Sequence, residues 1–443
     1  MTSHPPAHAP DDAPEAAVPE ASPPSVPAPA PRRTGVLVAA IAIVAVLAGS
    51  ALFVSGWTLG RQSALTPGTA ASEAEEFQAF WDTWRAVTER YAGGDVDRKA
   101  LIEGAIKGMI GALEDPYSQY LTSDEFRQSL RDIGGEFEGI GATIGTVDAA
   151  GRTSACGTLS PECRLVIVAP LADSPAERAG LLPGDVVTAI DGAALDGLTV
   201  DEARGKVRGP KDTTVTLTVD REGREPFDVP IVRAVIISPE VDVEQLADGR
   251  VTYLRLSGFS DHAAEQLDAA VREAIDAGRR SLILDLRGNP GGYVTAAREI
   301  ASEFLADGTI FWQEDADGNL VETVATPGGV ATDPAIELAV LVDGGSASAS
   351  EIVAGALHDR ERATLVGTRT YGKGTVQQWT QLEADSGGFR LTIAKWLTPD
   401  RTWVHEVGIT PDVVVDERPA EPGDDPVLDA ALEVLVGADG APR

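Results

Sequence analysis

Short apolar strands alternate with helices in the second half of the chain, from Val235 onward. The strand candidates are the apolar runs VTYLRL, SLILDLR, LAVLVD and ATLVG. Between them, apolar residues recur at helical spacing from Ala263 to Ala277, from about Thr295, and again after Ser348. Strands that alternate with helices form sheets whose two faces are both covered. The pattern therefore predicts an α/β domain here.

A different pattern extends from about Phe137 to Val232. Short β-rich runs, RLVIVAP, DVVTAIDG, TVTLTVD and PFDVPIV, are separated by turn residues. Two short helical segments lie between them, at Ser174 to Ala179 and at Thr199 to Val207. This stretch is predicted to be a compact β module.

Helical spacing also marks the region before this β module. An amphipathic helix is predicted from the apolar residues Phe77, Phe80, Trp81, Trp84, Val87 and Tyr91. A second helix is expected from Arg98 to about Leu113, and the segment DPYSQYL then begins with a turn at Asp115 and Pro116. Residues 61–136 are thus predicted to be a helical N-terminal region.

The N-terminus combines a polar tail with a long uncharged segment. Residues 1–33 are rich in Pro and Ala and have too few large apolar side chains to fold, so they are predicted to be disordered. Residues 34–60 carry no charge, and about 20 apolar residues suffice to cross a bilayer. The stretch exceeds the roughly 7 to 15 residues of a signal-peptide core, which favours a retained anchor. Arg32 and Arg33 precede it, which predicts a single-pass cell-membrane protein with extracytoplasmic domains.

Composition narrows the possible partners. The 443 residues allow two to three domains, and the formal net charge of -33 argues against nucleic acid as a partner. Cys156 and Cys163 are the two cysteines, and in an oxidising compartment they can form a disulfide, although two free thiols are the alternative. No zinc-binding spacing includes them. We expect no metal and no organic cofactor.

Ser348 begins an apolar helix in SASASEIVAGAL. The simplest interpretation is structural, because Ser348 and Glu351 have the spacing of a capping box. The other interpretation is a serine nucleophile, and it depends on Lys373. A lysine can act as the base for a serine only when its amine is neutral.

Lys373 lies between Gly372 and Gly374, which permit close backbone approach, and no acidic residue follows or precedes it within six positions. Gln377 falls on the same face of an expected strand and can orient the amine without adding charge. The loop from Gly367 to Lys373 resembles a phosphate-binding loop, but it lacks the Ser or Thr after the lysine. A serine and lysine pair is therefore favoured over nucleotide binding.

Two further loops have backbone amides that can hold an anion. DLRGNPGG follows a strand, and together with the Ala349 amide it can form an oxyanion hole. The loop in FEGIGATIG lacks the third glycine of a dinucleotide fingerprint, and its amides can instead hold a peptide carboxylate. A histidine triad through His262 or His405 stays open as an alternative, since neither has an acidic partner recognisable by spacing.

These motifs, in this order, resemble the carboxyl-terminal processing peptidases, also called tail-specific proteases, with an embedded PDZ domain. The likeness extends from about Phe77 to Val415 and includes DPYSQYL, GIGA, SPAERAGLLPGDVVTAIDG, DLRGNPGG, SASASEIVAGAL and GKGTVQ. The resemblance implies Ser348 as nucleophile, Lys373 as general base and Gln377 as its orienting partner. It also implies an α/β, crotonase-like serine protease core.

The same resemblance implies the binding residues. The oxyanion hole comes from the Ala349 amide and Gly291, with Gly292 as second choice, and the substrate's free carboxylate is bound by the loop of Gly139, Ile140, Gly141 and Ala142. The implied activity is endoproteolysis upstream of a protein C-terminus that the PDZ domain holds. A silent PDZ scaffold that binds exported C-termini is the alternative.

The expected organisation is an α/β multidomain chain. Its segments are the disordered tail 1–33, the transmembrane anchor 34–60, the helical region 61–136, the PDZ domain 137–232, the protease core 233–420 and an acidic C-terminal segment 421–443. The insertion TSACGTLSPEC inside the β module departs from the family pattern. Polypeptides with free C-termini are the expected substrates, and an N-terminal helix is the expected link to the membrane.

Overall fold

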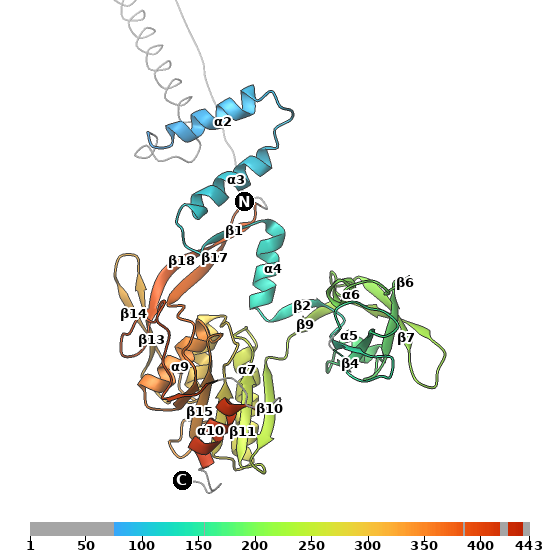
Figure 1. Cartoon of the computed structure of the whole chain (residues 1–443). Coiled ribbons are helices and arrows are strands. Elements are labelled where there is room, and N and C mark those ends of the chain that lie inside the picture. The colour runs from blue at the N-terminus through green and yellow to red at the C-terminus, as the bar shows by residue number, and fades with distance from the viewer. Residues whose placement is uncertain (1–74, 155, 384–385, 417–423, 437–443) are drawn as a thin grey trace, which may run out of the picture. The chain divides into compact units, whose positions relative to one another are not determined.

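The computed structural model describes residues 75–154, 156–383, 386–416 and 424–436 (Figure 1). The chain divides into two compact units, residues 1–98 and residues 99–443. In the first unit, α2 (Gln78–Arg90) forms where the apolar spacing predicts it. The predicted tail and the predicted transmembrane segment, residues 1–60, lie outside the described residues. Within the described ranges, no helix has the length and apolar character needed to span a membrane.

A six-stranded sheet forms the centre of the α/β domain (Figure 1). Its strands, in spatial order, are β10 (Val241–Leu246), β11 (Val251–Leu256), β12 (Ser281–Asp285), β15 (Glu337–Val342), β16 (Thr364–Gly367) and β19 (Val413–Val414). All neighbouring pairs are parallel except β10 with β11. The predicted apolar runs supply four of these strands.

Both faces of this sheet are covered, as the unbroken apolar strands predict. One face packs against α7 (Ala263–Asp276), α8 (Val294–Ser302) and α9 (Ala349–Asp359). The opposite face packs against α10 (Pro426–Val436). Successive strand residues serve the two faces in turn, so that Leu284 belongs to the first core and Ile283 to the second.

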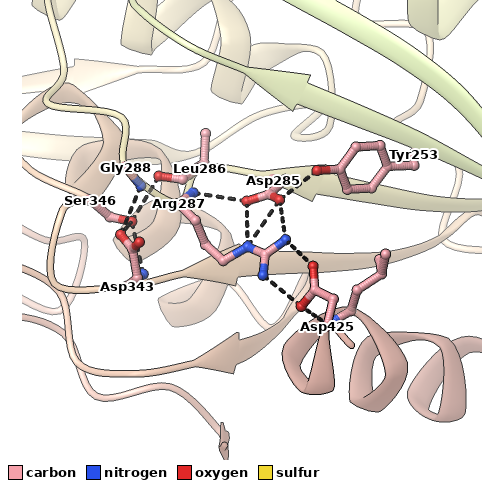
Figure 2. A network of polar contacts seen from close by, with 9 residues as sticks. Tyr253, Asp285, Leu286, Arg287, Gly288, Asp343, Ser346 and Asp425 are labelled. Carbon is pink, nitrogen blue, oxygen red and sulfur yellow. Dashed lines mark hydrogen bonds and ion pairs between the residues drawn. The ribbon is translucent and has the colours of Figure 1, made fainter. Parts of the chain in front are cut away.

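The helix α10 was not predicted, because its segment was interpreted from its acidic composition alone. Val427, Ala431 and Leu435 of α10 are buried. Its first turn is joined to the end of β12 by a charged cluster, shown in Figure 2. The guanidinium of Arg287 donates to Asp285 at 2.6 Å and to Asp425 at 2.8 Å.

A second, antiparallel sheet lies beside the site described below. It contains β1 (Gln119–Leu121), β13 (Thr309–Asp315), β14 (Leu320–Val324), β17 (Thr375–Gln381) and β18 (Gly388–Leu397). Strand β1, which comes from the segment DPYSQYL, pairs with β18. Helices α3 (Arg98–Gly111) and α4 (Ser123–Ile133) flank β1 in the chain. A capping box of Thr122 and Glu125 begins α4.

The β module has a core of its own. Its elements are β3 (Ala142–Val147), β4 (Arg164–Pro170), α5 (Pro175–Arg178), β5 (Val186–Ile190), β6 (Ala193–Ala194), α6 (Val200–Val207), β7 (Thr214–Asp220) and β8 (Phe227–Val232). The chain enters through β2 (Glu136–Gly139) and leaves through β9 (Ala234–Ile237), and these two strands pair with each other. Cys156 and Cys163 are joined in a disulfide, with their Cα atoms 6.1 Å apart.

Candidate active site

Ser348 is held in an unusual backbone conformation at the start of α9. Its φ is 57° and its ψ is −114°, although side-chain-bearing residues seldom adopt a positive φ. Strain of this kind typically costs about 1–3 kcal/mol and persists where the surrounding structure enforces it. The residue is buried, with 8% of its surface exposed. The serine therefore has the turned geometry typical of a nucleophile between a strand and a helix.

The loop DLRGNPGG approaches this serine closely, and only glycine fits there. Gly291 has a φ of +97°, and a β-carbon on it would lie 2.9 Å from the Cβ of Ser348 and 2.9 Å from the amide nitrogen of Ala349. The loop is fixed by Asn289, whose side-chain amide donates to the carbonyl of Leu256 at 2.8 Å. The close approach places the loop backbone against Ser348.

The amides predicted to bind an oxyanion differ in whether they already donate a hydrogen bond within the protein. The Gly291 N–H donates to the side-chain oxygen of Asn289 at 2.9 Å. Within the described part of the chain, the amides of Ala349 and Gly292 donate no recorded hydrogen bond. The present geometry therefore favours Gly292, the second choice from sequence, as the loop donor beside Ala349.

Lys373 is carried by a loop that packs tightly on its neighbours. A β-carbon on Gly372 would lie 2.9 Å from the amide nitrogen of Gly408, and one on Gly374 would lie 2.8 Å from that of His405. The carbonyl of Lys373 accepts a hydrogen bond from the indole of Trp396 at 2.8 Å. The two glycines permit the close backbone approach that the sequence predicts.

The surroundings of Lys373 favour its neutral amine. Burial lowers the pKa of Lys373, and the nearby charge of Arg390 lowers it further, while the charges of Glu351 and Asp115 act in the opposite direction. The amine nitrogen lies 5.1 Å from the centre of the Tyr117 ring. Among the described residues, no hydrogen bond joins it to Ser348.

In the described part of the chain, no hydrogen bond joins Gln377 to the lysine amine. Its side-chain nitrogen donates to the hydroxyl of Thr375 at 2.9 Å and to that of Thr392 at 3.1 Å. Strand β17 begins at Thr375, after Lys373, and its pairing with β18 is irregular between Val376 and Gln377. The simple alternation that predicts contact between Lys373 and Gln377 is broken there.

One cavity of about 1200 Å³ brings the predicted residues together. It is lined by Ser348, Lys373, Gln377, Gly291 and Gly292. Helix α4 and the side chains of Trp379 and Arg390 form another part of its wall. Helix α4 lies within residues 61–136, which the sequence predicts to be helical, but no individual helix was predicted for residues 123–133, although the capping box of Thr122 and Glu125 indicates its start. The cavity is open and has room for an extended peptide segment.

No histidine lines this cavity in the described chain. His262 lies 3.7 Å from Glu136, and His358 lies 3.1 Å from Asp359. His405 stacks on Trp403, with ring centres 5.1 Å apart. Among the residues that line the cavity, Lys373 is therefore the candidate base, and no histidine is placed there.

The predicted carboxylate-binding loop borders a separate pocket of the β module. Ile140, Gly141 and Ala142 line a pocket of about 250 Å³ with Arg204 and Val207 of α6. Gly139 lies in β2, outside that lining. The carbonyls of Ile140 and Gly141 accept hydrogen bonds at 2.8 Å and 2.9 Å, whereas their N–H groups donate none within the described residues. Two free amides beside an arginine suit a carboxylate.

Three family models match parts of this chain. The model of peptidase family S41 matches residues 250–415, that of the PDZ domain matches residues 166–221, and that of the activating protease CtpB N-terminal domain matches residues 54–125. The carboxy-terminal processing protease CtpB of Bacillus subtilis is 34% identical over 86% of this chain and 78% of its own length.

Two further relatives cover most of the chain. The carboxyl-terminal-processing protease of Synechocystis is 36% identical over 87% of this chain and 86% of its own length. The solved structure of the photosystem II D1 C-terminal processing protease is 28% identical, covers 82% of this chain and 92% of its own, and gives a TM-score of 0.45. The family models and the curated relatives together show that this chain belongs to the carboxyl-terminal processing proteases, serine-type peptidases of family S41 with a PDZ domain.

Proposed function

We propose that this peptidase uses Ser348 as nucleophile and Lys373 as general base to cleave polypeptides whose free C-termini its PDZ domain binds. The observation that carries this proposal is that one cavity contains Ser348, Lys373 and the Gly291 loop. The lowered pKa of Lys373 supports the assignment, because the amine must be neutral to accept a proton. No metal or cofactor has a role in this chemistry.

The reaction follows from these positions. The hydroxyl oxygen of Ser348 attacks the scissile carbonyl carbon while its proton passes to the Lys373 amine. The carbonyl oxygen becomes an oxyanion, which the amides of Ala349 and Gly292 stabilise, at roughly 3–4 kcal/mol for each donor. Lys373 then returns the proton to the leaving amine. Water then attacks the acyl-enzyme while Lys373 accepts a proton from it. Lys373 returns this proton to the Ser348 oxygen as the ester bond breaks, which releases the acyl group as a carboxylic acid and restores the free serine.

The amine must first move from its place over Tyr117 toward Ser348. The attraction of an amine to an aromatic face requires a positive charge, so it does not oppose this movement once the amine is neutral. The long lysine side chain has the rotatable bonds for it. In this proposal Gln377 acts on the pair through Thr375 and Thr392 rather than by direct contact.

Selection of free C-termini is assigned to the loop at Ile140 and Gly141. Their unpaired N–H groups and the positive charge of Arg204 match a terminal carboxylate, and the adjoining pocket accepts an apolar last side chain. Amidation of the peptide removes the negative charge that these groups bind. We expect an amidated peptide to bind more weakly and to be cut more slowly than the free acid.

The decisive experiment compares the two peptides with wild-type protein and with Ser348→Ala. The wild type should cleave the free acid faster than the amide, and Ser348→Ala should bind the free acid but cleave neither. Full turnover by Ser348→Ala would refute the mechanism. Equal cleavage of both peptides by the wild type would refute C-terminal selection while leaving the mechanism intact.

Anchoring in the cell membrane, with extracytoplasmic domains, is also part of the proposal. The uncharged residues 34–60 behind Arg32 and Arg33 support it. The disulfide of Cys156 and Cys163 fits an oxidising compartment. In fractionated cells, the full chain should sediment with membranes and be open to external protease, and deletion of residues 1–60 should release it. Recovery of the full chain in the soluble fraction would exclude the anchor.

A further inference from the structure

Glu351 is a fully buried acid in the first turn of α9, with 0% of its surface exposed. An ionised side chain is seldom buried without partners, because removing its charge from water is costly. In the part of the chain that the structure describes, no lysine, arginine or histidine forms a salt bridge with Glu351. Its hydrogen-bond partners are three backbone amides and one hydroxyl. These four donors take the place of the water molecules that would solvate the carboxylate at the surface.

The four hydrogen bonds come from the two halves of the proposed catalytic pair. One carboxylate oxygen, Oε2, accepts from the amide of Ser348 at 2.8 Å and from the amide of Lys373 at 2.8 Å. The other oxygen, Oε1, accepts from the amide of Gly372 at 2.7 Å and from the hydroxyl of Thr370 at 2.6 Å. Because all four groups donate, both oxygens act as acceptors, which is the bonding pattern of a carboxylate.

A single oxygen atom thus ties the backbone of the nucleophile to the backbone of the base. Ser348 needs such a tie because its positive φ is strained. Lys373 needs one because it precedes β17 and has no strand partner of its own. Bonds from backbone amides to a carboxylate are shorter and stronger than those between neutral groups.

We propose that Glu351 is a positioning residue that sets the separation of Ser348 and Lys373, an inference that rests on the proposed pairing of these two residues in catalysis. Capping of α9 alone does not explain the arrangement, because a cap requires only the bond to Ser348. Three of the four bonds reach the segment from Thr370 to Lys373, which belongs to the loop between β16 and β17.

The geometry makes Glu351→Gln a sharp test. A glutamine has one acceptor oxygen and one NH₂ group, and NH₂ cannot accept a hydrogen bond. In either orientation of the side chain, the NH₂ group therefore faces two donors that have lost their acceptor. In one orientation it loses the bonds to Ser348 and Lys373, and in the other it loses those to Gly372 and Thr370. Glu351→Asp keeps both acceptors but is shorter by one methylene group and cannot reach both sides at once.

The experiment measures kcat and KM for a peptide with a free C-terminus, using the full chain in detergent. Misplacing reacting groups by about 1 Å can cost about a hundredfold in rate, so we expect kcat to fall about a hundredfold in both Glu351 variants. KM should change little, because the PDZ pocket that holds the peptide end is separate. Ser302→Ala serves as control, since it also removes a buried bond, to the amide of Thr326, but away from the catalytic pair.

Hydrogen exchange gives a second readout that general destabilisation does not mimic. In the wild type, the amides of Gly372 and Lys373 should exchange as slowly as those of α9. In a folded Glu351→Gln protein they should exchange at least tenfold faster, while the remainder of α9 stays protected. Rapid exchange of these two amides in the wild type overturns the inference, whether or not the variants fold.

The outcomes separate the two proposals. If Ser348→Ala is inactive and a folded Glu351 variant keeps the wild-type kcat, the positioning role is refuted and the catalytic pair stands. If kcat falls no more than in Ser302→Ala, Glu351 has only a structural role. If Ser348→Ala stays active, the pair itself is wrong and the inference falls with it.

Discussion

The amine of Lys373 lies 5.1 Å from the centre of the Tyr117 ring, so the proposed base rests on an aromatic face from the segment DPYSQYL. That segment is anchored beside the site, because the carbonyl of Tyr117 accepts a hydrogen bond from Arg390 at 2.9 Å. The ring favours the charged amine, whereas burial and the charge of Arg390 favour the neutral one. The balance between these effects sets the pH at which the base becomes active.

The pH dependence of kcat should report this balance. Lys373 works as a base only when deprotonated, so activity should be lost as the pH falls through its pKa, which lies below that of an ordinary lysine. Tyr117→Leu removes the aromatic face, lowers this pKa further, and should move the acidic limb down by roughly half a pH unit. Tyr117→Phe keeps the ring and should leave the limb in place. If the acidic limb of the pH profile of kcat moves to higher pH in Tyr117→Leu, the Tyr117 ring does not stabilise the charged amine.

Replacing the base should abolish cleavage even when the charge is kept. Lys373→Arg cannot release its proton at working pH, and Lys373→Ala lacks the amine. We expect kcat to fall by about a thousandfold or more in both, as measured by peptide cleavage. Lys395→Ala, which removes a partly exposed lysine paired with Glu314, is the matched control and should keep its activity. Substantial turnover by Lys373→Arg would rule out proton transfer by this residue.

The glycine beside the nucleophile should not tolerate even a methyl group. Gly291→Ala would place a β-carbon 2.6 Å from the carbonyl oxygen of Ala347 and 2.9 Å from the Cβ of Ser348. The loop must then shift, so kcat should fall by about 10²-fold or more, while the PDZ domain still binds peptide. Gly288→Ala, in the same loop and with φ of +68°, meets no atom within 4 Å and controls for backbone strain. Similar losses in both variants would show that strain, rather than the close contact, causes the effect.

Asp425 should matter for stability, because it holds the first turn of α10. Although burial opposes the shift, hydrogen bonds from Arg287 lower the pKa of Asp425. Its contribution is therefore present above the unfolded pKa and is lost as the pH falls through the lower folded pKa. Asp425→Asn should reduce the free energy of unfolding by about 1–2 kcal/mol at neutral pH and by less in acid, as measured by denaturant titration. Asp429→Asn removes an exposed charge of the same helix and should have a smaller effect. Equal effects of the two variants would contradict the role of Arg287.

The sequence points to residues that line one cavity, but it says less about the elements around them. Ser348 and Lys373 stand in local motifs whose glycines and apolar spacing have a direct physical meaning, and α9 begins at Ala349 as that spacing predicts. Tyr117 was not predicted to lie near Lys373, because its segment contains only a local turn signal. The pairing of β1 with β18 that brings it there depends on contacts distant in sequence.

Gln377 and α10 show two other limits. Alternation along an ideal strand predicts that Gln377 faces Lys373, but the strand begins later and its register is irregular, so the side chain reaches Thr392. The acidic composition near the C-terminus concealed an apolar stripe in α10. In that segment helical spacing was the more informative signal, since four apolar residues of α10 are buried against the sheet: Val427, Ala431, Leu435 and Val436.

The pairing of β1 with β18 joins two segments that are made at different times during synthesis of the chain. The PDZ domain is contiguous in sequence and has a separate core, so it can fold as soon as residues 142–232 have emerged. The catalytic cavity needs Gln119 near the beginning and Arg390 close to the end. A nascent chain can therefore complete its PDZ domain before the residues that line the cavity have all been made.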